Sequence, residues 1–138
     1  MAGFTERRRV EWGDCDAAGI VYYPNYFKWM DEVFHAFTRD RGFDQRSLVR
    51  DGFLGTPLVD ASCSFARPLR YYTELDVTLT VTRVGRSSFG LSYDFRVDAQ
   101  QVAEGLEVRA IVAEDAGRVV ARQIPEAVRA ALLGALAS

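Results

Sequence analysis

Two carboxylates stand two residues apart in a short segment that leads into a predicted helix start. Asp14 and Asp16 lie between Gly13 and Gly19, and Pro24 suits the first position of a helix because it lacks an N–H. A helix start presents unpaired N–H groups and a partial positive charge, which polarise a carbonyl oxygen and stabilise the charge it gains on attack. A nearby carboxylate can attack that carbonyl or activate a water. The segment alone also fits a turn in which Asp side chains cap backbone groups, so spacing leaves the function open.

The residue counts exclude several other chemistries. His35 is the single histidine and the two cysteines, Cys15 and Cys63, are far apart, so no common zinc site can be assembled and we expect no metal. We expect the cysteines to be free thiols. A serine or cysteine triad would have to use His35, and a Schiff base would have to use Lys28. Glycine-rich phosphate loops are missing from the sequence, and we expect no cofactor.

Charge and hydropathy narrow the choice of partners. Seventeen Lys and Arg stand against nineteen Asp and Glu, a net charge of −2, which disfavours nucleic acid. The segment after the N-terminal arginines is not apolar, and we find no apolar run as long as a membrane span. We therefore expect a soluble, cytoplasmic protein without a membrane partner, and the 138 residues predict one domain spanning 1–138.

One long helix is predicted from Pro24 to Arg41, closed by Gly42 as a C-terminal cap. Its apolar and aromatic residues cover most of its circumference, so the helix should be buried on most sides. Lys28 and His35 fall on its polar side. A short helix from Asp44 to Arg50, capped by Asp44 or Ser47, is predicted next.

The period changes to two after Thr56. Alternating apolar residues predict strands over 74–82 and 88–97, joined by a hairpin at 84–87, and further strands over 106–112 and 118–122. An initial strand over 5–12 and a final helix over 125–136 complete the prediction. The short connections favour an antiparallel meander, and the economical way to bury the long helix is to curl the sheet around it, an α+β fold. The edge strands of such a sheet favour oligomerisation.

At this level of detail the chain resembles a known family. The run from Asp14 to Tyr26 (DCDAAGIVYYPNY), the following Trp29-Met30-Asp31 and the later Gly55-Thr56-Pro57 look like the acyl-CoA thioesterases of the 4-hydroxybenzoyl-CoA thioesterase type. The resemblance covers essentially the whole chain and implies the hot-dog fold, an antiparallel sheet of five to six strands wrapped around one central helix.

The resemblance assigns roles position by position. The second Asp of the Asp-x-Asp pair, here Asp16, is the catalytic carboxylate of the family, and the backbone N–H at the helix start, here that of Tyr23, polarises the thioester carbonyl. Asp31 matches a carboxylate that meets the ring hydroxyl of a 4-hydroxybenzoyl group from the neighbouring subunit, and a carboxylate on a helix is as commonly a solvated residue. Thr56 and Trp29 are the other expected substrate-binding residues.

Other positions depart from the family pattern or match it weakly. Asp14 has no matching catalytic role and is expected to be a turn or capping group. Other branches of the superfamily carry a His near the helix start, where this chain has Tyr23, and His35 lies too far downstream, so we expect it to be structural or exposed.

The coenzyme A phosphates need cationic surface. Related enzymes often contact them from the hairpin that here carries Arg83, Arg86 and Ser88, and Arg67, Arg70 and Arg122 are further candidates. For any single one of these arginines, an ordinary solvated charge is the favoured alternative. This hairpin has fewer basic residues than its relatives, which implies looser or differently arranged nucleotide binding.

Three functions remain open at this point. The first is hydrolysis of an aromatic acyl-CoA, such as 4-hydroxybenzoyl-CoA or another benzoyl-CoA, to free acid and CoA, with Asp16 as nucleophile or general base. The second is a thioesterase for short or medium aliphatic acyl-CoA or for acyl carrier protein. The third is a non-catalytic hot-dog protein that binds acyl-CoA or serves in an assembly. The resemblance also implies a homo-oligomer with sites at the subunit interface. We expect at least a dimer, and a tetramer as the full assembly.

Overall fold

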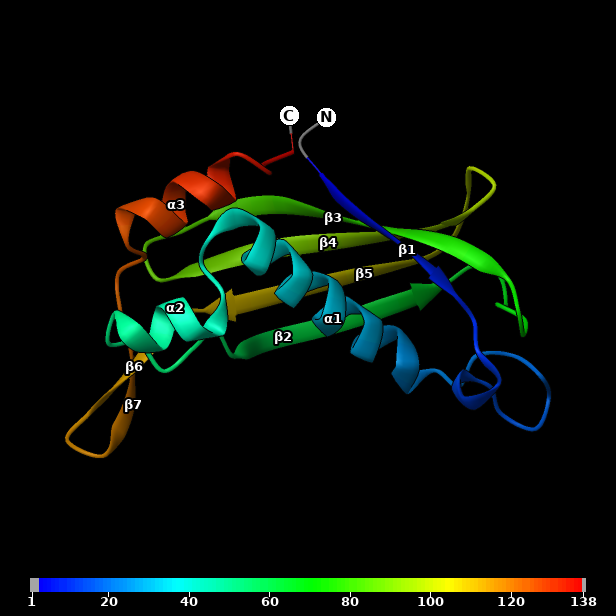
Figure 1. Ribbon diagram of the computed structural model, residues 1–138, viewed down its shortest axis with the longest axis horizontal. Coiled ribbons are helices and arrows are strands. Elements are labelled where there is room, and N and C mark those ends of the chain that lie inside the picture. Colours follow the sequence, from blue (N-terminus) through cyan, green and yellow to red (C-terminus); the bar gives the residue numbers. More distant parts are fainter. Residues whose placement is uncertain (1–2, 138) are drawn as a thin grey trace.

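A five-stranded antiparallel sheet packs against one long helix in the computed structural model, which describes residues 3–137 (Figure 1). The elements in chain order are β1 (Phe4–Arg9), the 3-10 turn η1 (Trp12–Asp14), α1 (Pro24–Arg41), α2 (Gln45–Arg50), β2 (Leu58–Phe65), β3 (Glu74–Val84), β4 (Ser88–Val97), β5 (Gln100–Ala110), β6 (Val112–Asp115), β7 (Arg118–Ala121) and α3 (Glu126–Leu133). This confirms the predicted α+β hot-dog arrangement.

The helix α1 has the predicted bounds because its two ends carry strong local signals. Pro24 occupies its first position, and Gly42 ends it in the left-handed conformation, with φ 82°, where its N–H donates to the Thr38 carbonyl. Between these ends α1 buries a continuous aromatic and aliphatic surface that includes Trp29, Met30, Val33, Phe34 and Phe37, each at most 3% exposed. Burying side chains of this size stabilises the fold by about 1.5–3 kcal/mol each, so α1 forms the centre of the core.

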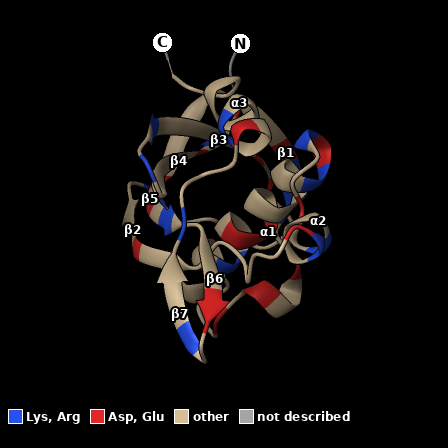
Figure 2. Cartoon of the chain, turned by 90° about the vertical axis from the view of Figure 1, so that its left-hand side faces the viewer, with Lys and Arg blue, Asp and Glu red and all other residues tan. Residues whose placement is uncertain are grey.

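The strand order is β1-β3-β4-β5-β2, so the predicted meander holds only for β3, β4 and β5. β1 pairs with β3 at one edge, and β2, which precedes the meander in the chain, pairs with β5 at the other edge. Seen from the end, the sheet curves around α1, with α3 above and α2 beside the helix (Figure 2). Within this five-stranded sheet, strands that follow one another in the chain are therefore neighbours only inside the meander.

Several predicted boundaries shift. The first strand ends at Arg9, and the predicted 106–112 strand is the end of the longer β5, which stops at Ala110 before β6 starts as part of a separate hairpin with β7. The last helix ends at Leu133 rather than residue 136. α2 begins at Gln45 with Asp44 as the N-cap, whose carboxylate accepts the Ser47 N–H at 3.0 Å, which selects Asp44 between the two predicted caps.

The face of β5 is the main surprise of the fold. Leu106 and Val108 alternate in a way that normally marks the core side of a strand, yet Leu106 is 48% exposed while Glu107 and Arg109 are each 3% exposed. The register decides this, because β5 pairs Gly105, Glu107 and Arg109 with buried residues of β4. Two opposite charges therefore lie between the sheet and α1.

No helix in the described part of the chain is long and apolar enough to cross a membrane.

Candidate active site

The segment before α1 folds into a tight turn that holds Asp16. The Asp16 N–H donates to the Ile20 carbonyl at 2.9 Å, and its carboxylate accepts the Ala18 N–H at 2.9 Å. Gly19 closes the turn with φ 77°, a conformation that favours glycine, and donates to the Asp16 carbonyl at 3.0 Å. The carboxylate is solvent-exposed in the single chain, so it is held in place by local hydrogen bonds and open to a reactant.

Asp14 has the capping role predicted for it. Its carboxylate accepts the Glu11 N–H at 2.8 Å within a capping box around η1. Its carbonyl accepts the Asn25 side-chain amide at 2.8 Å and the Tyr22 N–H at 2.9 Å. These bonds tie the segment to the first turn of α1 and so fix where the neighbouring Asp16 turn sits.

Tyr23 is the N-cap residue of α1, and its backbone N–H donates to no other residue among 3–137. Its carbonyl is engaged, because it accepts the Tyr26 N–H at 3.2 Å. The unengaged N–H lies at the positive end of an 18-residue helix, the location where a ligand oxygen gains most from a backbone donor.

A first cavity, of about 330 Å³, opens beside this helix start. It is lined by Ile20, Val21, Tyr23, Tyr26 and residues 65–69. Burial raises the pKa of the Tyr26 hydroxyl to about 12, so this side chain stays neutral across the physiological range. Asp16 is not among the residues that line this cavity in the single chain, but Ile20, whose carbonyl accepts the Asp16 N–H, does line it.

A second cavity, of about 490 Å³, lies along α1 from the first. Its wall consists of Asp31, His35, Gln45, residues 54–58, Arg109, Val112 and Val119. Asp31 and Thr56 thus meet in one cavity, whereas Tyr23 belongs to the other, and Trp29 is 3% exposed, packed against Tyr26, and lines neither. The predicted substrate contact of Trp29 stays a prediction. The volume suits a small organic group, since ligand cavities span about 300–1,000 Å³.

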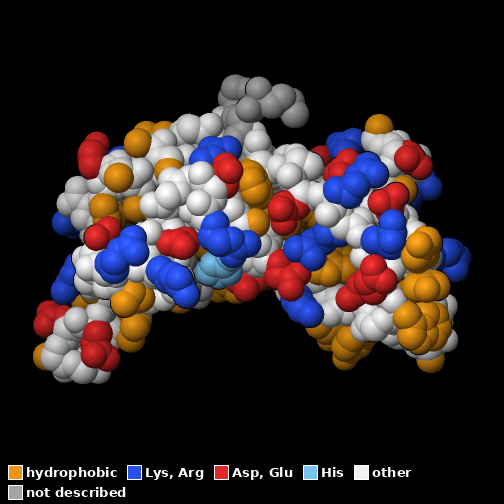
Figure 3. Space-filling view, in the orientation of Figure 1, with side chains coloured by type: hydrophobic (Ala, Val, Ile, Leu, Met, Phe, Trp, Pro, Cys, Tyr) orange, Lys and Arg blue, Asp and Glu red, His pale blue; other side chains and the backbone are white. Residues whose placement is uncertain are grey.

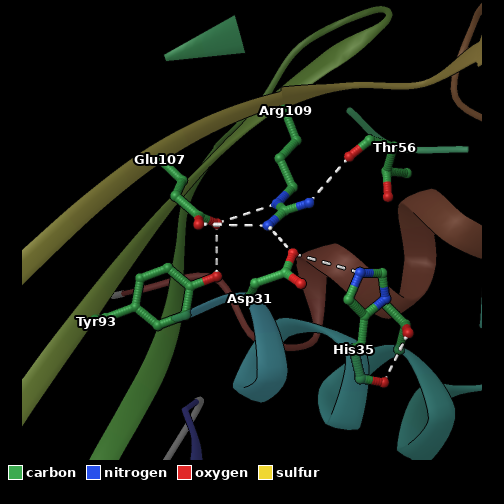
Figure 4. A network of polar contacts seen from close by, with 7 residues as sticks. Asp31, His35, Thr56, Tyr93, Glu107 and Arg109 are labelled. Atoms are coloured by element: carbon green, nitrogen blue, oxygen red, sulfur yellow. Dashed lines mark hydrogen bonds and ion pairs between the residues drawn. The ribbon is translucent and has the colours of Figure 1, made fainter. Parts of the chain in front are cut away.

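A chain of buried polar contacts reaches the second cavity from the sheet (Figure 4). The Tyr93 hydroxyl donates to Glu107 at 2.7 Å, Arg109 donates to both Glu107 oxygens, and Arg109 also donates to Asp31 at 3.0 Å. Burial and the adjacent Glu107 carboxylate raise the pKa of Tyr93. Burial opposes the charge of Arg109, but the hydrogen bonds and charge of Glu107 outweigh it, and the pKa of Arg109 is raised. The guanidinium therefore stays charged.

The residues expected to contact the CoA phosphates lie in three separate groups. The Arg83 guanidinium donates to the Ser88 hydroxyl at 3.3 Å, so these two side chains engage each other. Arg86 instead lines a surface cavity of about 350 Å³ together with Arg122 and Gln123. Arg67 lines the first cavity and, with Arg70, a neighbouring one. Two pairs of candidates thus share a cavity: Arg86 with Arg122, and Arg67 with Arg70.

Four residues of the polar network that reaches the second cavity escaped the sequence prediction, and two of them, Arg109 and His35, line the cavity. Arg109, Glu107 and Tyr93 were hidden in strands, and His35, expected to be structural or exposed, has Nε2 at 3.5 Å from Asp31. The pair of opposite charges at 107 and 109, two positions apart on one strand face, was the available signal. Without knowledge of the strand register, these two charges would be interpreted as part of a solvated face.

Comparison with known proteins decides the family. The family model of the thioesterase-like superfamily matches residues 10–132. The chain belongs to the thioesterase-like superfamily. It is a thioester hydrolase of the acyl-CoA thioesterase type, and a solved relative of that type shares its fold over 94% of this chain.

Three relatives within the thioesterase-like superfamily illustrate the similarity. The 4-hydroxybenzoyl-CoA thioesterase of Pseudomonas sp. strain CBS-3 is 30% identical over 88% of this chain and 91% of its own. Its solved structure gives a TM-score of 0.86 at 29% identity, covering 94% and 98% of the two chains. A 1,4-dihydroxy-2-naphthoyl-CoA hydrolase of Synechococcus elongatus is 32% identical over 75% of this chain and 76% of its own. A solved gentisyl-coenzyme A thioesterase is 35% identical with a TM-score of 0.81, covering 94% and 99% of the two chains.

Proposed function

We propose that this acyl-CoA thioesterase hydrolyses a hydroxylated aromatic acyl-CoA, with 4-hydroxybenzoyl-CoA as the reference substrate, to the free acid and CoA. The observation that carries the proposal is the unengaged Tyr23 N–H at the wall of the first cavity, one tight turn away from the exposed Asp16 carboxylate. The N–H donates a hydrogen bond to the thioester carbonyl oxygen, and its position at the helix start stabilises the charge that grows on that oxygen.

Asp16 then supplies the reacting carboxylate. As a nucleophile it attacks the thioester carbon, the C–S bond breaks, CoA leaves as a thiolate that takes up a proton, and water hydrolyses the mixed anhydride. As a general base it removes a proton from a water that attacks the same carbon. A rapid-quench mass spectrum distinguishes the routes, since only the first places the acyl group on Asp16.

The complete site requires two subunits in this proposal. Tyr23 and Asp31 are eight residues apart on the α1 axis, about 12 Å at 1.5 Å per residue, and they line different cavities. The carbonyl therefore docks at Tyr23 of one subunit while the ring reaches Asp31 of another.

The edge strand β2 offers the way to bring such cavities together. Leu58, Val59 and Phe65 are 49%, 63% and 49% exposed on this unpaired edge, which is the kind of surface that natural proteins cover. Leu58 lines the second cavity and Phe65 the first. Antiparallel pairing of two β2 strands about a twofold axis places the start of one beside the end of the other, and so the first cavity of each subunit beside the second cavity of its partner.

Subunit complementation tests this arrangement. We expect Asp16→Asn and Asp31→Ala homodimers to be impaired separately, and a mixture allowed to exchange subunits to regain activity, because the heterodimer holds one intact site. Recovery should approach half the wild-type activity per heterodimer. Mixtures that stay at the level of the parent variants would place both groups in one subunit.

The ring substituent is assigned to the second cavity. Its Asp31 carboxylate is an acceptor for a ring hydroxyl, which favours the aromatic substrates named for the relatives over aliphatic acyl chains. A 1,4-dihydroxy-2-naphthoyl group is the second candidate, since several relatives carry that activity in their names. Steady-state kinetics over hydroxybenzoyl, dihydroxynaphthoyl, phenylacetyl and aliphatic CoA thioesters ranks them.

The CoA phosphates are assigned to the surface cavity that holds Arg86 and Arg122, with Arg83 and Ser88 on the same hairpin as supporting contacts. Arg→Ala variants of this set should raise KM and leave kcat nearly unchanged.

Asp16→Asn tests the central assignment. Detection of free CoA thiol should show turnover of 4-hydroxybenzoyl-CoA reduced by about a thousandfold or more, because the amide is neither a nucleophile nor a base. Asp14→Asn is the matched control: it makes the same charge change in the same turn at a group that only caps η1, and should stay within about threefold of the wild type. An Asp16→Asn protein with wild-type turnover would refute the assignment, and a wild-type protein inactive on every thioester would indicate a binding function.

A further inference from the structure

A charged pair is buried where the fold gains little from it. Glu107 and Arg109 are each 3% exposed, between the sheet and α1. Removing two charges from water carries a desolvation penalty that their attraction only offsets in favourable geometry, and apolar residues of similar size often serve stability as well. The pair therefore invites an explanation other than stability.

Every side of the Arg109 guanidinium is occupied. Nε and Nη2 donate to Glu107 at 3.0 and 3.3 Å, and Nη1 donates to the Thr56 carbonyl at 3.0 Å. Its flat face lies over the Phe34 ring at 4.0 Å. Glu107 is itself held by the Tyr93 hydroxyl at 2.7 Å. The guanidinium thus has one orientation, set by two strands and the helix.

The remaining Arg109 contact is to Asp31, which lies at the wall of the second cavity. Nη2 donates to Asp31 Oδ1 at 3.0 Å, and His35 Nε2 lies 3.5 Å from the same oxygen. The other oxygen, Oδ2, receives no hydrogen bond from residues 3–137, and the side chain is 53% exposed. Figure 4 shows Arg109 and His35 on either side of this carboxylate, with Thr56 beyond the guanidinium.

We propose that Arg109 is a positioning residue for substrate specificity: it clamps one oxygen of Asp31 so that the other faces the cavity as a fixed acceptor for a hydroxyl on the aromatic ring. Glu107 and Tyr93 hold the clamp. This inference rests on the proposed aromatic acyl-CoA substrate and adds residues that bind no substrate themselves.

The charge balance makes the selection specific for a donor. Arg109 and Glu107 neutralise each other, so Asp31 leaves the cluster with one net negative charge when His35 is neutral. A ring hydroxyl donates to Oδ2, a methoxy group of similar shape has no proton to donate, and a ring carboxylate is repelled. A free Asp31 side chain would rotate and lose part of this discrimination to entropy.

The experiment compares 4-hydroxybenzoyl-CoA, 4-methoxybenzoyl-CoA and benzoyl-CoA by kcat/KM. The first variant is Arg109→Lys, which keeps a positive charge beside Glu107 but cannot reach Glu107, Thr56 and Asp31 together. The second is the double variant Glu107→Leu with Arg109→Met, which removes the buried pair without leaving one charge unpaired and is measured if the lysine variant does not fold. Arg8→Lys is the matched control. Arg8 forms an ion pair at 2.8 Å with Glu32, the residue that follows Asp31 on α1, and this pair does not line the cavity.

The wild type should prefer the hydroxy over the methoxy substrate by about ten- to a hundredfold, the range for one hydrogen bond to a charged acceptor. In either Arg109 variant the preference should fall below about threefold, through the hydroxy substrate alone, while benzoyl-CoA stays within about threefold of wild type. Arg8→Lys should keep the full preference.

Three results would overturn the inference: a wild type without hydroxyl preference, a variant that keeps it, or an equal loss on all three substrates, which marks a purely structural role. If the wild type hydrolyses none of them, the proposed function fails instead. Calorimetric titration of the same three thioesters into wild type and variant then tests the clamp by binding preference.

Discussion

Replacing Gly105 by alanine tests how closely α1 packs on the sheet. Gly105 lies on the core face of β5, and a methyl group built there would lie 2.5 Å from Met30 Sδ and 2.7 Å from its Cε. Met30 is fully buried on α1. The close approach explains why a glycine stands inside a central strand, where it otherwise weakens the sheet.

The magnitude follows from two opposing effects. Overpacking a filled core costs about 1–3 kcal/mol, and the offending atoms are the flexible end of Met30, which favours the lower half of that range. Alanine also lowers the entropy of the unfolded chain, which offsets about 0.4–1 kcal/mol. After this offset we expect Gly105→Ala to lower the free energy of unfolding by about 1 kcal/mol.

A double-mutant cycle makes the prediction specific to this contact. Met30→Ala alone should cost about 2–5 kcal/mol by leaving a cavity. In the double variant the new methyl fills part of that cavity, so its destabilisation should be about 1–2 kcal/mol smaller than the sum of the single effects. Urea unfolding at one fixed protein concentration measures all four proteins, since association contributes to apparent stability. Additive effects, or a Gly105→Ala protein as stable as wild type, would contradict the packing described.

Three further predictions concern single side chains. Burial raises the pKa of the Cys63 thiol to about 11, so its thiolate fraction at pH 8 is about one in a thousand. Labelling of Cys63 by iodoacetamide, followed by mass spectrometry, should be at least about tenfold slower than labelling of free cysteine. The labelling should accelerate as the pH rises towards 11. Tyr23→Phe should keep kcat/KM within about twofold, because the proposed donor is its backbone N–H; a large loss would mean that the hydroxyl takes part. Asp44→Ala should lower the melting temperature, because α2 loses the cap on the Ser47 N–H, and an unchanged melting temperature would show that the cap contributes nothing.

Local signals account for what the sequence predicted well. Pro24 and Gly42 act on their own turns of α1, and their neighbours in the chain suffice to place both helix ends. The capping role of Asp14 has the same local origin. The alternation of β3 and β4 also needed no distant partner, since nearly every second residue is apolar.

Pairing between distant segments explains what the sequence could not predict. β2 lies beside β5 only through pairs of residues that are 38 to 51 positions apart in the sequence, so neither its place at the edge nor the cavity formed at Leu58 is encoded locally. The inward face of Glu107 and Arg109 follows from the register with β4, and a register shift of one residue would have turned both charges to the solvent. The resemblance to the family made Asp31 a candidate, whereas its contact with Arg109 became visible only with that register.

The packing at Gly105 and the clamp at Arg109 depend on each other. Both residues project from the same face of β5, four positions apart, towards α1, and Met30 and Asp31 are consecutive on the helix. The missing side chain at position 105 lets α1 approach β5, and this approach is what brings Asp31 within 3.0 Å of a guanidinium rooted in the sheet. A side chain at position 105 that pushes the helix outward should therefore weaken the hold on Asp31 as well as the core. Gly105→Ala should lower the hydroxyl preference in kcat/KM in addition to stability, whereas Phe37→Leu, a core change two turns further along α1, should lower stability alone.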